Sequence, residues 1–160
     1  MMNKTVCFTG HRAIPDEIYP TLCALLDREL EKQIENGARI FRAGGALGFD
    51  TLAALCVLSA RVRHPEIRLE LILPSPDQAQ RWDPRDRAIY KEILARADSH
   101  RYVGQSYFPG VLQLRNRALV QDSDVCIAYL CNSKGGGTAY TASLALKAGI
   151  ELINLNDLLP

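Results

Sequence analysis

Short apolar runs alternate with longer amphipathic segments along the whole chain. The apolar runs cover residues 5–9, 39–43, 68–73, 100–103, 124–130 and 150–155. Runs of this length, bounded by glycine, proline or polar residues, are typical of buried strands. The chain is therefore expected to form a series of short strands.

The segments between these runs have the periodicity of helices. Ile18, Leu22 and Leu25 lie three or four residues apart, so they share one helix face. Helices are predicted over residues 15–36, 49–63, 110–121 and 138–148, and another starts at Ser75, restarts at Pro84 and continues to Ala97. This alternation predicts a single α/β domain, doubly wound, with a mostly parallel sheet and helices on both faces. Right-handed crossovers then place the strand-to-helix loops at one edge of the sheet.

Composition and charge exclude several classes of protein. A chain of 160 residues, 48% of them hydrophobic, can bury one core without a second domain. The 19 basic residues balance 18 acidic ones, so nucleic acid is not an expected partner. No apolar run approaches the roughly 20 residues of a membrane span, and the N-terminus lacks the apolar core of a signal peptide. We therefore expect a cytoplasmic location. The five cysteines include no C-x-x-C pair, which favours core thiols over a metal site.

The stretch Ser-Lys-Gly-Gly-Gly-Thr at residues 133–138 lies between a predicted strand and a predicted helix. Its glycines, Gly135, Gly136 and Gly137, permit positive φ angles and close approach of a ligand to the backbone. A helix that begins at Thr138 presents unpaired N–H groups and the positive end of its dipole, which suits a phosphate. A flexible loop with Thr138 as an ordinary N-cap is the alternative.

Three further loops leave the same predicted edge. They contribute Thr9, Gly10, His11 and Arg12 after the first strand, Gly44, Gly45, Gly48 and Asp50 after the second, and Gln78 and Trp82 after the third. Because these loops converge, we expect them to form one ligand site. The glycine spacing matches neither the dinucleotide fingerprint nor a Walker loop, which disfavours a dehydrogenase or a kinase.

Each of these side chains also has a structural interpretation. His11 and Arg12 either contact a phosphate or base or form a surface turn. Asp50 either bonds a ribose hydroxyl or caps its helix. Gln78 either contacts the ligand or completes a capping box, and Trp82 either stacks on a base or belongs to the core.

Arg115 lies on the apolar face of a predicted helix, where a charge needs an anionic partner. That partner is a ligand phosphate, Asp50 or Asp124. Asn116, next in the chain, is a further candidate for ligand contact.

These residues resemble a known family over nearly the whole chain. The opening Phe-Thr-Gly-His-Arg at residues 8–12, the segment 44–54, Gln78 with Trp82, and the Gly-Gly-Gly-Thr loop are similar to the YpsA-like branch of the SLOG superfamily. That superfamily includes the DNA-processing protein DprA and the LOG phosphoribohydrolases. The resemblance implies a Rossmann-like fold that binds nucleotides or nucleotide-derived ligands.

The resemblance to the LOG enzymes is incomplete at their catalytic positions. In those enzymes an arginine and a glutamate act on the N-glycosidic bond of a nucleoside monophosphate. Arg115 falls at the arginine position, but Thr141 falls at the glutamate position and cannot supply a carboxylate. Hydrolysis would need another acid, for which Asp50 is the candidate.

These observations leave two functional classes for the protein. They differ in whether the protein catalyses a reaction, which the sequence does not decide. The first is a sensor or regulatory module that binds a small anionic, nucleotide-like ligand and requires no cofactor. The second is a hydrolase of the N-glycosidic bond of nucleotides. Single-stranded DNA binding is disfavoured because no basic stripe with interleaved aromatic residues is present. Members of the superfamily commonly self-associate, which leaves a homo-oligomer open.

Overall fold

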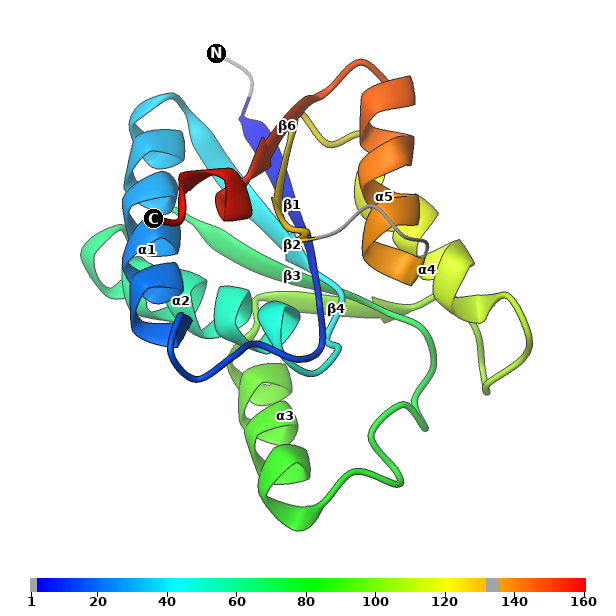
Figure 1. Ribbon diagram of the computed structural model, residues 1–160. Coiled ribbons are helices and arrows are strands. Elements are labelled where there is room, and N and C mark those ends of the chain that lie inside the picture. The colour runs from blue at the N-terminus through cyan, green and yellow to red at the C-terminus, as the bar shows by residue number, and fades with distance from the viewer. Residues whose placement is uncertain (1–2, 132–135) are drawn as a thin grey trace.

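Parallel strands run through the centre of the molecule (Figure 1). The computed structural model describes residues 3–131 and 136–160. The strands are β1 (Lys4–Gly10), β2 (Ala38–Ala43), β3 (Arg68–Leu73), β4 (Ser99–Tyr102), β5 (Val125–Tyr129) and β6 (Glu151–Asn154). They pair in the order β4-β3-β2-β1-β5-β6, and each of these pairs is parallel. The predicted parallel sheet is confirmed.

Helices cover both faces of this sheet. They are α1 (Tyr19–Glu35), α2 (Phe49–Arg63), α3 (Pro84–Arg96), α4 (Val111–Val120) and α5 (Gly136–Lys147), and a short 3-10 helix, η1 (Leu155–Leu158), follows β6. Helices α1 and α2 pack on one face, and α4 and α5 pack on the other (Figure 1). The predicted doubly wound, Rossmann-like α/β fold is therefore confirmed.

The side chains of β1 divide the core between the two helical layers. Val6 and Phe8 lie in the larger apolar cluster, which α1 and α2 cover. Cys7 points to the other face and packs with Cys126 and with Leu119 of α4. Successive side chains of a strand point to opposite faces. A strand buried on both faces therefore has a continuous apolar sequence.

Helix α1 begins later than the periodicity predicts. The expected start was Pro15, but the helix begins at Tyr19. Before it lies a turn in which the Ile18 N–H donates to the Pro15 carbonyl at 3.1 Å. Pro20 explains the difference, because a proline has no N–H and clashes with the carbonyl four residues earlier. It is tolerated only in the first turn of a helix.

The segment between β3 and α3 forms turns instead of the predicted helix start. The Ser75 hydroxyl donates to the Asp77 carboxylate, so no capping box forms with Gln78. Helix α3 begins at Pro84, with Asp83 as its N-cap. A residue that precedes proline avoids the helical region, which prevents a helix from continuing through this point.

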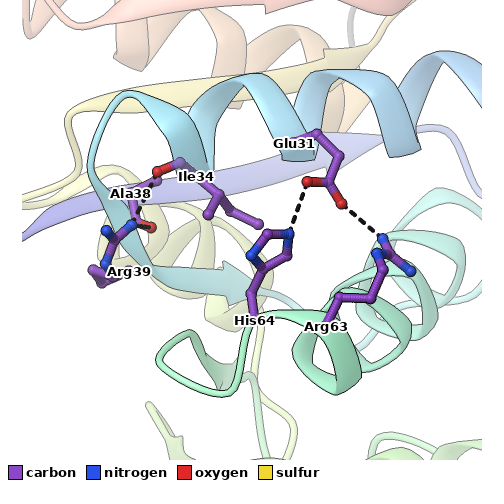
Figure 2. Close-up of polar contacts among 6 residues, drawn as sticks. All are labelled: Glu31, Ile34, Ala38, Arg39, Arg63 and His64. Carbon is purple, nitrogen blue, oxygen red and sulfur yellow. Dashed lines mark hydrogen bonds and ion pairs between the residues drawn. The ribbon is translucent and has the colours of Figure 1, made fainter.

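Glu31 links the two helices that cover one face of the sheet (Figure 2). Its carboxylate accepts a hydrogen bond from Arg63 Nη2 and lies next to His64 Nε2, both at 2.8 Å. The hydrogen bond from Arg63, and after it the one from His64, lowers the pKa of Glu31. Nearby, Arg39 of β2 donates to the Ile34 carbonyl at 3.0 Å (Figure 2). It thereby satisfies a carbonyl group at the end of α1.

Glu31→Gln should lower the free energy of unfolding at neutral pH by about 0.2–1 kcal/mol, the range measured for exposed ion pairs. A carboxyl group whose pKa is lowered by folding stabilises the fold above its unfolded pKa. That contribution disappears as the pH falls through the folded value. The difference between wild type and variant should therefore shrink as the pH falls below about 4.

Urea denaturation across this pH range measures the effect. Glu35→Gln, an exposed change on the same helix, is the control and should show a smaller difference at neutral pH. A difference between wild type and Glu31→Gln that is constant down to about pH 3 would contradict the assignment.

Candidate functional site

The strand order reverses beside β1, and this reversal positions the site. The chain passes from β1 outward through β2 and β3 to β4, and then returns to β5 on the other side of β1 (Figure 1). The segments that follow β1 and β5 therefore diverge and leave a crevice between them. Ligands of open parallel sheets bind in such crevices, beyond the carboxyl ends of the strands.

Glycines allow the loops after β1 and β2 to touch. A Cβ atom on Gly48 would overlap the Arg12 carbonyl, and a Cβ atom on Gly10 would overlap the Phe49 side chain. Gly48 also has a φ of 78°, which disfavours a side chain. The Phe49 N–H donates to the His11 carbonyl at 3.1 Å. The start of α2 is thus packed against the end of β1.

A cavity of about 290 Å³ lies in this crevice and is called the first cavity below. The predicted site residues that line it are Thr9, Gly10, His11, Arg12, Asp50, Arg115, Asn116, Gly137 and Thr138. Phe8, Ala46, Leu112 and Leu119 complete its walls. Residues from β1, α2, α4 and α5 therefore meet around one space.

Arg115 is the buried cation of the first cavity, with 5% of its surface exposed. Its Nη1 donates to the Gly44 carbonyl, and its Nε donates to Asn116 Oδ1 at 2.8 Å. Asp124, one of its predicted partners, accepts a hydrogen bond from the Thr5 N–H at 2.8 Å instead. Because that bond lies at the opposite end of β1, Asp124 is excluded as the partner of Arg115.

Asp50 lies against the same glycine as Arg115. A Cβ atom on Gly44 would be 2.9 Å from both Asp50 Oδ2 and Arg115 Nη1. Within the described residues, no ion pair shorter than 4.0 Å joins these two charges. The Asp50 carboxylate accepts a hydrogen bond from the Ala46 N–H at 3.2 Å, so it braces the glycine loop and does not cap α2. Burial raises the pKa of Asp50, and the charge of Arg115 opposes this shift.

His11 connects the ends of β1 and β5. Its Nε2 accepts a hydrogen bond from the Cys131 N–H at 3.0 Å. Its ring meets Tyr129 edge to face, with centroids 5.5 Å apart. Arg12 is exposed and lines the first cavity.

A second cavity, of about 540 Å³, adjoins the first and shares Arg12 and Leu112 with it. Gln78 and Trp82 lie here and not in the first cavity. The other lining residues are Leu47, Pro74, Ser75, Asp77, Gln80, Arg81 and Tyr107. Tyr107 was not predicted, although its loop follows β4 and leaves the same edge of the sheet, a position that could have indicated it.

The remaining residues predicted for the site either line neither cavity or lie outside the described residues. Gly44, Gly45, Gly48 and Gly136 line neither cavity, and Gly135 lies outside the described residues. Gly136 begins α5 with a φ of 87°. Thr141 is fully buried, and its hydroxyl donates to the Gly137 carbonyl at 2.8 Å. Thr141 therefore does not present a polar group to the first cavity.

Residues 3–131 and 136–160 contain no group of three or more His, Cys, Asp or Glu placed to hold a metal ion. In the same part of the chain, no helix has the length and apolar character needed to span a membrane.

The family model YpsA, described as the YspA SLOG family, matches residues 7–157. The chain belongs to this family. UPF0398 protein BH1768 of Halalkalibacterium halodurans is 31% identical to the SLOG chain over an alignment of 170 positions that includes 97% of this chain and 90% of that protein. UPF0398 protein BCG9842_B3730 of Bacillus cereus is 28% identical over 91% of this chain and 84% of that protein.

Two solved structures of DNA processing protein A are similar to the SLOG chain. The Helicobacter pylori protein, described for its single-stranded DNA binding mode, has a TM-score of 0.65 and 27% identity over 93% of this chain and 63% of that chain. The Streptococcus pneumoniae protein has a TM-score of 0.65 and 14% identity over 94% of this chain and 49% of that chain. The SLOG chain thus spans less than two thirds of either protein, and the second likeness shows the fold alone.

Proposed function

We propose that this SLOG protein binds a nucleotide or nucleotide-derived ligand and acts as a sensor or regulatory binding module. One observation carries this proposal: Arg12, Arg115 and the first turn of α5 meet at one cavity where the strand order reverses. We expect the ligand phosphate to bind there without a required cofactor. The cytoplasmic location of the protein and its assembly into a homo-oligomer remain predictions from the sequence.

The first cavity favours an anion for two reasons. The guanidinium of Arg115 carries more N–H donors than its bonds to Gly44 and Asn116 use. Gly137 and Thr138 lie in the first turn of α5, where unpaired N–H groups and the helix dipole attract negative charge. The carboxylate of Asp50 works against an anion, but burial raises its pKa and so disfavours its charged form.

Gly137→Asp should weaken the binding of ribose 5-phosphate and nucleoside monophosphates by about tenfold or more, because a carboxylate repels the phosphate. Gly137→Asn is the matched control, since it has nearly the same shape without the charge. A Cβ atom at this position would lie 3.4 Å from Asn116 Nδ2, an ordinary contact, so both side chains fit. Isothermal titration calorimetry measures the two affinities. Equal affinities of the two variants, or no binding of any phosphate by the wild type, would exclude an anion site here.

A hydrolase of the N-glycosidic bond is the second candidate. It is favoured by Asp50, because a general acid needs a raised pKa and this carboxyl group lines the first cavity beside Arg115. Two observations oppose it. Thr141 replaces the glutamate of the LOG enzymes and is buried, and Asp50 already bonds the Ala46 N–H.

AMP and related monophosphates should be cleaved far more slowly than the common enzyme rates of about 1 to 10³ per second. The reason is that loss of one positioned acid costs about 10²- to 10⁴-fold. Chromatography of the released base measures the rate. Turnover in the common range would overturn the binding proposal. In that case Asp50→Asn should abolish turnover if Asp50 is the acid, whereas Asp122→Asn, on an exposed turn, should not.

Single-stranded DNA is a further ligand class, because the similar Helicobacter pylori protein is described for binding it. A net charge of +1 gives this chain no extended basic field. We therefore expect weak binding of single-stranded oligonucleotides at physiological salt, measured by fluorescence anisotropy. Sub-micromolar affinity that falls steeply with added salt would favour DNA over a free nucleotide.

A further inference from the structure

One side chain that lines the second cavity carries a buried polar atom with no hydrogen-bond partner within the described residues. This atom is the side-chain oxygen of Gln78. The Tyr90 hydroxyl is likewise buried and has no hydrogen-bond partner within the described residues. The two side chains are neighbours, because a Cβ atom on Gly45 would lie 3.4 Å from Gln78 Oε1 and 3.5 Å from Tyr90 Cε1. A buried acceptor without a partner destabilises a protein. Because Gln78 also lines the second cavity, rotation of its amide group would turn this oxygen toward a ligand N–H.

We propose that the second cavity binds the heterocyclic ring of a nucleoside phosphate, with the Gln78 amide hydrogen-bonded to the ring edge. This subsite rests on the proposed nucleotide-binding function and specifies where the ring of that ligand lies. The cavity volume of about 540 Å³ is within the range of about 300–1,000 Å³ found for small-molecule sites. Because both cavities share Arg12 and Leu112, one ligand reaches from the ring subsite to the phosphate site.

Trp82 provides the flat apolar surface that a ring requires. Its own ring meets Tyr90 at 80°, with centroids 5.3 Å apart. Edge-to-face contacts of this kind hold aromatic side chains in place. Stacking on an aromatic side chain tolerates any base. Trp82 therefore favours a ring in general, while Gln78 distinguishes ring edges.

Asp77 holds the walls of the second cavity together. Its carboxylate accepts hydrogen bonds from the Ser75 hydroxyl and from the Tyr107 N–H, the latter at 3.4 Å. These bonds connect the loop after β3 with the loop after β4. The cavity is thus formed before any ligand binds.

The chemistry of Gln78 indicates the ligand class. A primary amide offers an acceptor oxygen and two N–H donors side by side. Nucleobases carry amino or ring N–H donors next to acceptors along their edges. A sugar phosphate has no such edge and no planar ring to stack on Trp82. The ligand is therefore a nucleoside phosphate and not a simple sugar phosphate.

Calorimetry with AMP, GMP, CMP, UMP and ribose 5-phosphate tests the ring subsite. Wild type should bind at least one nucleotide about 10- to 100-fold more tightly than ribose 5-phosphate. Trp82→Ala should remove this difference and leave the affinity for ribose 5-phosphate unchanged. Trp82→Phe should retain most of the difference, because it keeps an aromatic ring.

Gln78→Met separates a ligand contact from a structural role. It should raise the melting temperature of the ligand-free protein by about 2–4 °C, because it removes the unsatisfied acceptor. It should also weaken nucleotide binding about tenfold. Gln33→Met is the matched control, since the buried Gln33 amide donates to Glu29 Oε2 at 3.1 Å. That variant should lower the melting temperature and leave nucleotide affinity unchanged.

Equal binding of nucleotides and ribose 5-phosphate by wild type would overturn the ring subsite. So would a Trp82→Ala variant that weakens both ligands by the same factor. If nucleotides bind and respond to Trp82→Ala but not to Gly137→Asp, the phosphate assignment is wrong while the ring subsite stands. If no nucleotide binds to the wild type, both assignments are wrong.

Discussion

The packing of the start of α2 against the end of β1 is the constraint on which the site depends. Gly10 and Gly48 lack side chains, so Phe49 and the Arg12 backbone approach them closely. This packing carries Asp50, in the first turn of α2, into the crevice beside β1. A side chain at either glycine would push the helix away and separate the walls of the first cavity. These glycines therefore act through backbone packing. A glycine-rich sequence by itself does not distinguish this role from phosphate contact.

The charges of Asp50 and Arg115 are buried together without forming a close ion pair. Burial disfavours both charged forms, because it raises the pKa of Asp50 and lowers that of Arg115. Each charge partly offsets the desolvation cost of burying the other. The Ala46 N–H donates a hydrogen bond to Asp50, and Arg115 donates one to the Gly44 carbonyl, which offsets part of the desolvation cost that remains. Asp50, Arg115 and Arg12 all line the first cavity, so two cations and one carboxyl group with a raised pKa surround the proposed ligand.

Local sequence was sufficient for the fold because strands and helices alternate with clear periods. The predicted helix starts were wrong where two nearby residues both had the sequence features of a helix start. Pro15 and Pro20 both suit a helix start, and only the later one defines it. Likewise Ser75 and Asp83 both suit an N-cap, and the proline after Asp83 decides between them.

The site was less predictable than the fold. The topology rule that loops converge beyond the strands predicted the loop residues around the first cavity, whereas Arg115 was predicted from its place on an apolar helix face. It did not show that Gln78 and Trp82 would lie in a separate cavity. Nor did it show which glycines pack against protein, because that depends on partners distant in sequence. Gly45, for example, lies against Leu73, and Gly44 lies against Arg115. Such pairings appear only when side chains are placed in three dimensions.

The polar groups around the first cavity are used to hold it together, which favours binding over chemistry. Asp50 bonds the Ala46 N–H and His11 bonds the Cys131 N–H. A general acid must release its proton and change partners during a reaction. Burial raises the pKa of Asp50, but the hydrogen bond from the Ala46 N–H acts in the lowering direction and so opposes the protonated form that a general acid needs. Gln78 is in the opposite situation, because its side-chain oxygen has no hydrogen-bond partner within the described residues. A ligand of the proposed kind that bound only the folded form would stabilise that form more strongly as its concentration rose, which is the response a sensor requires.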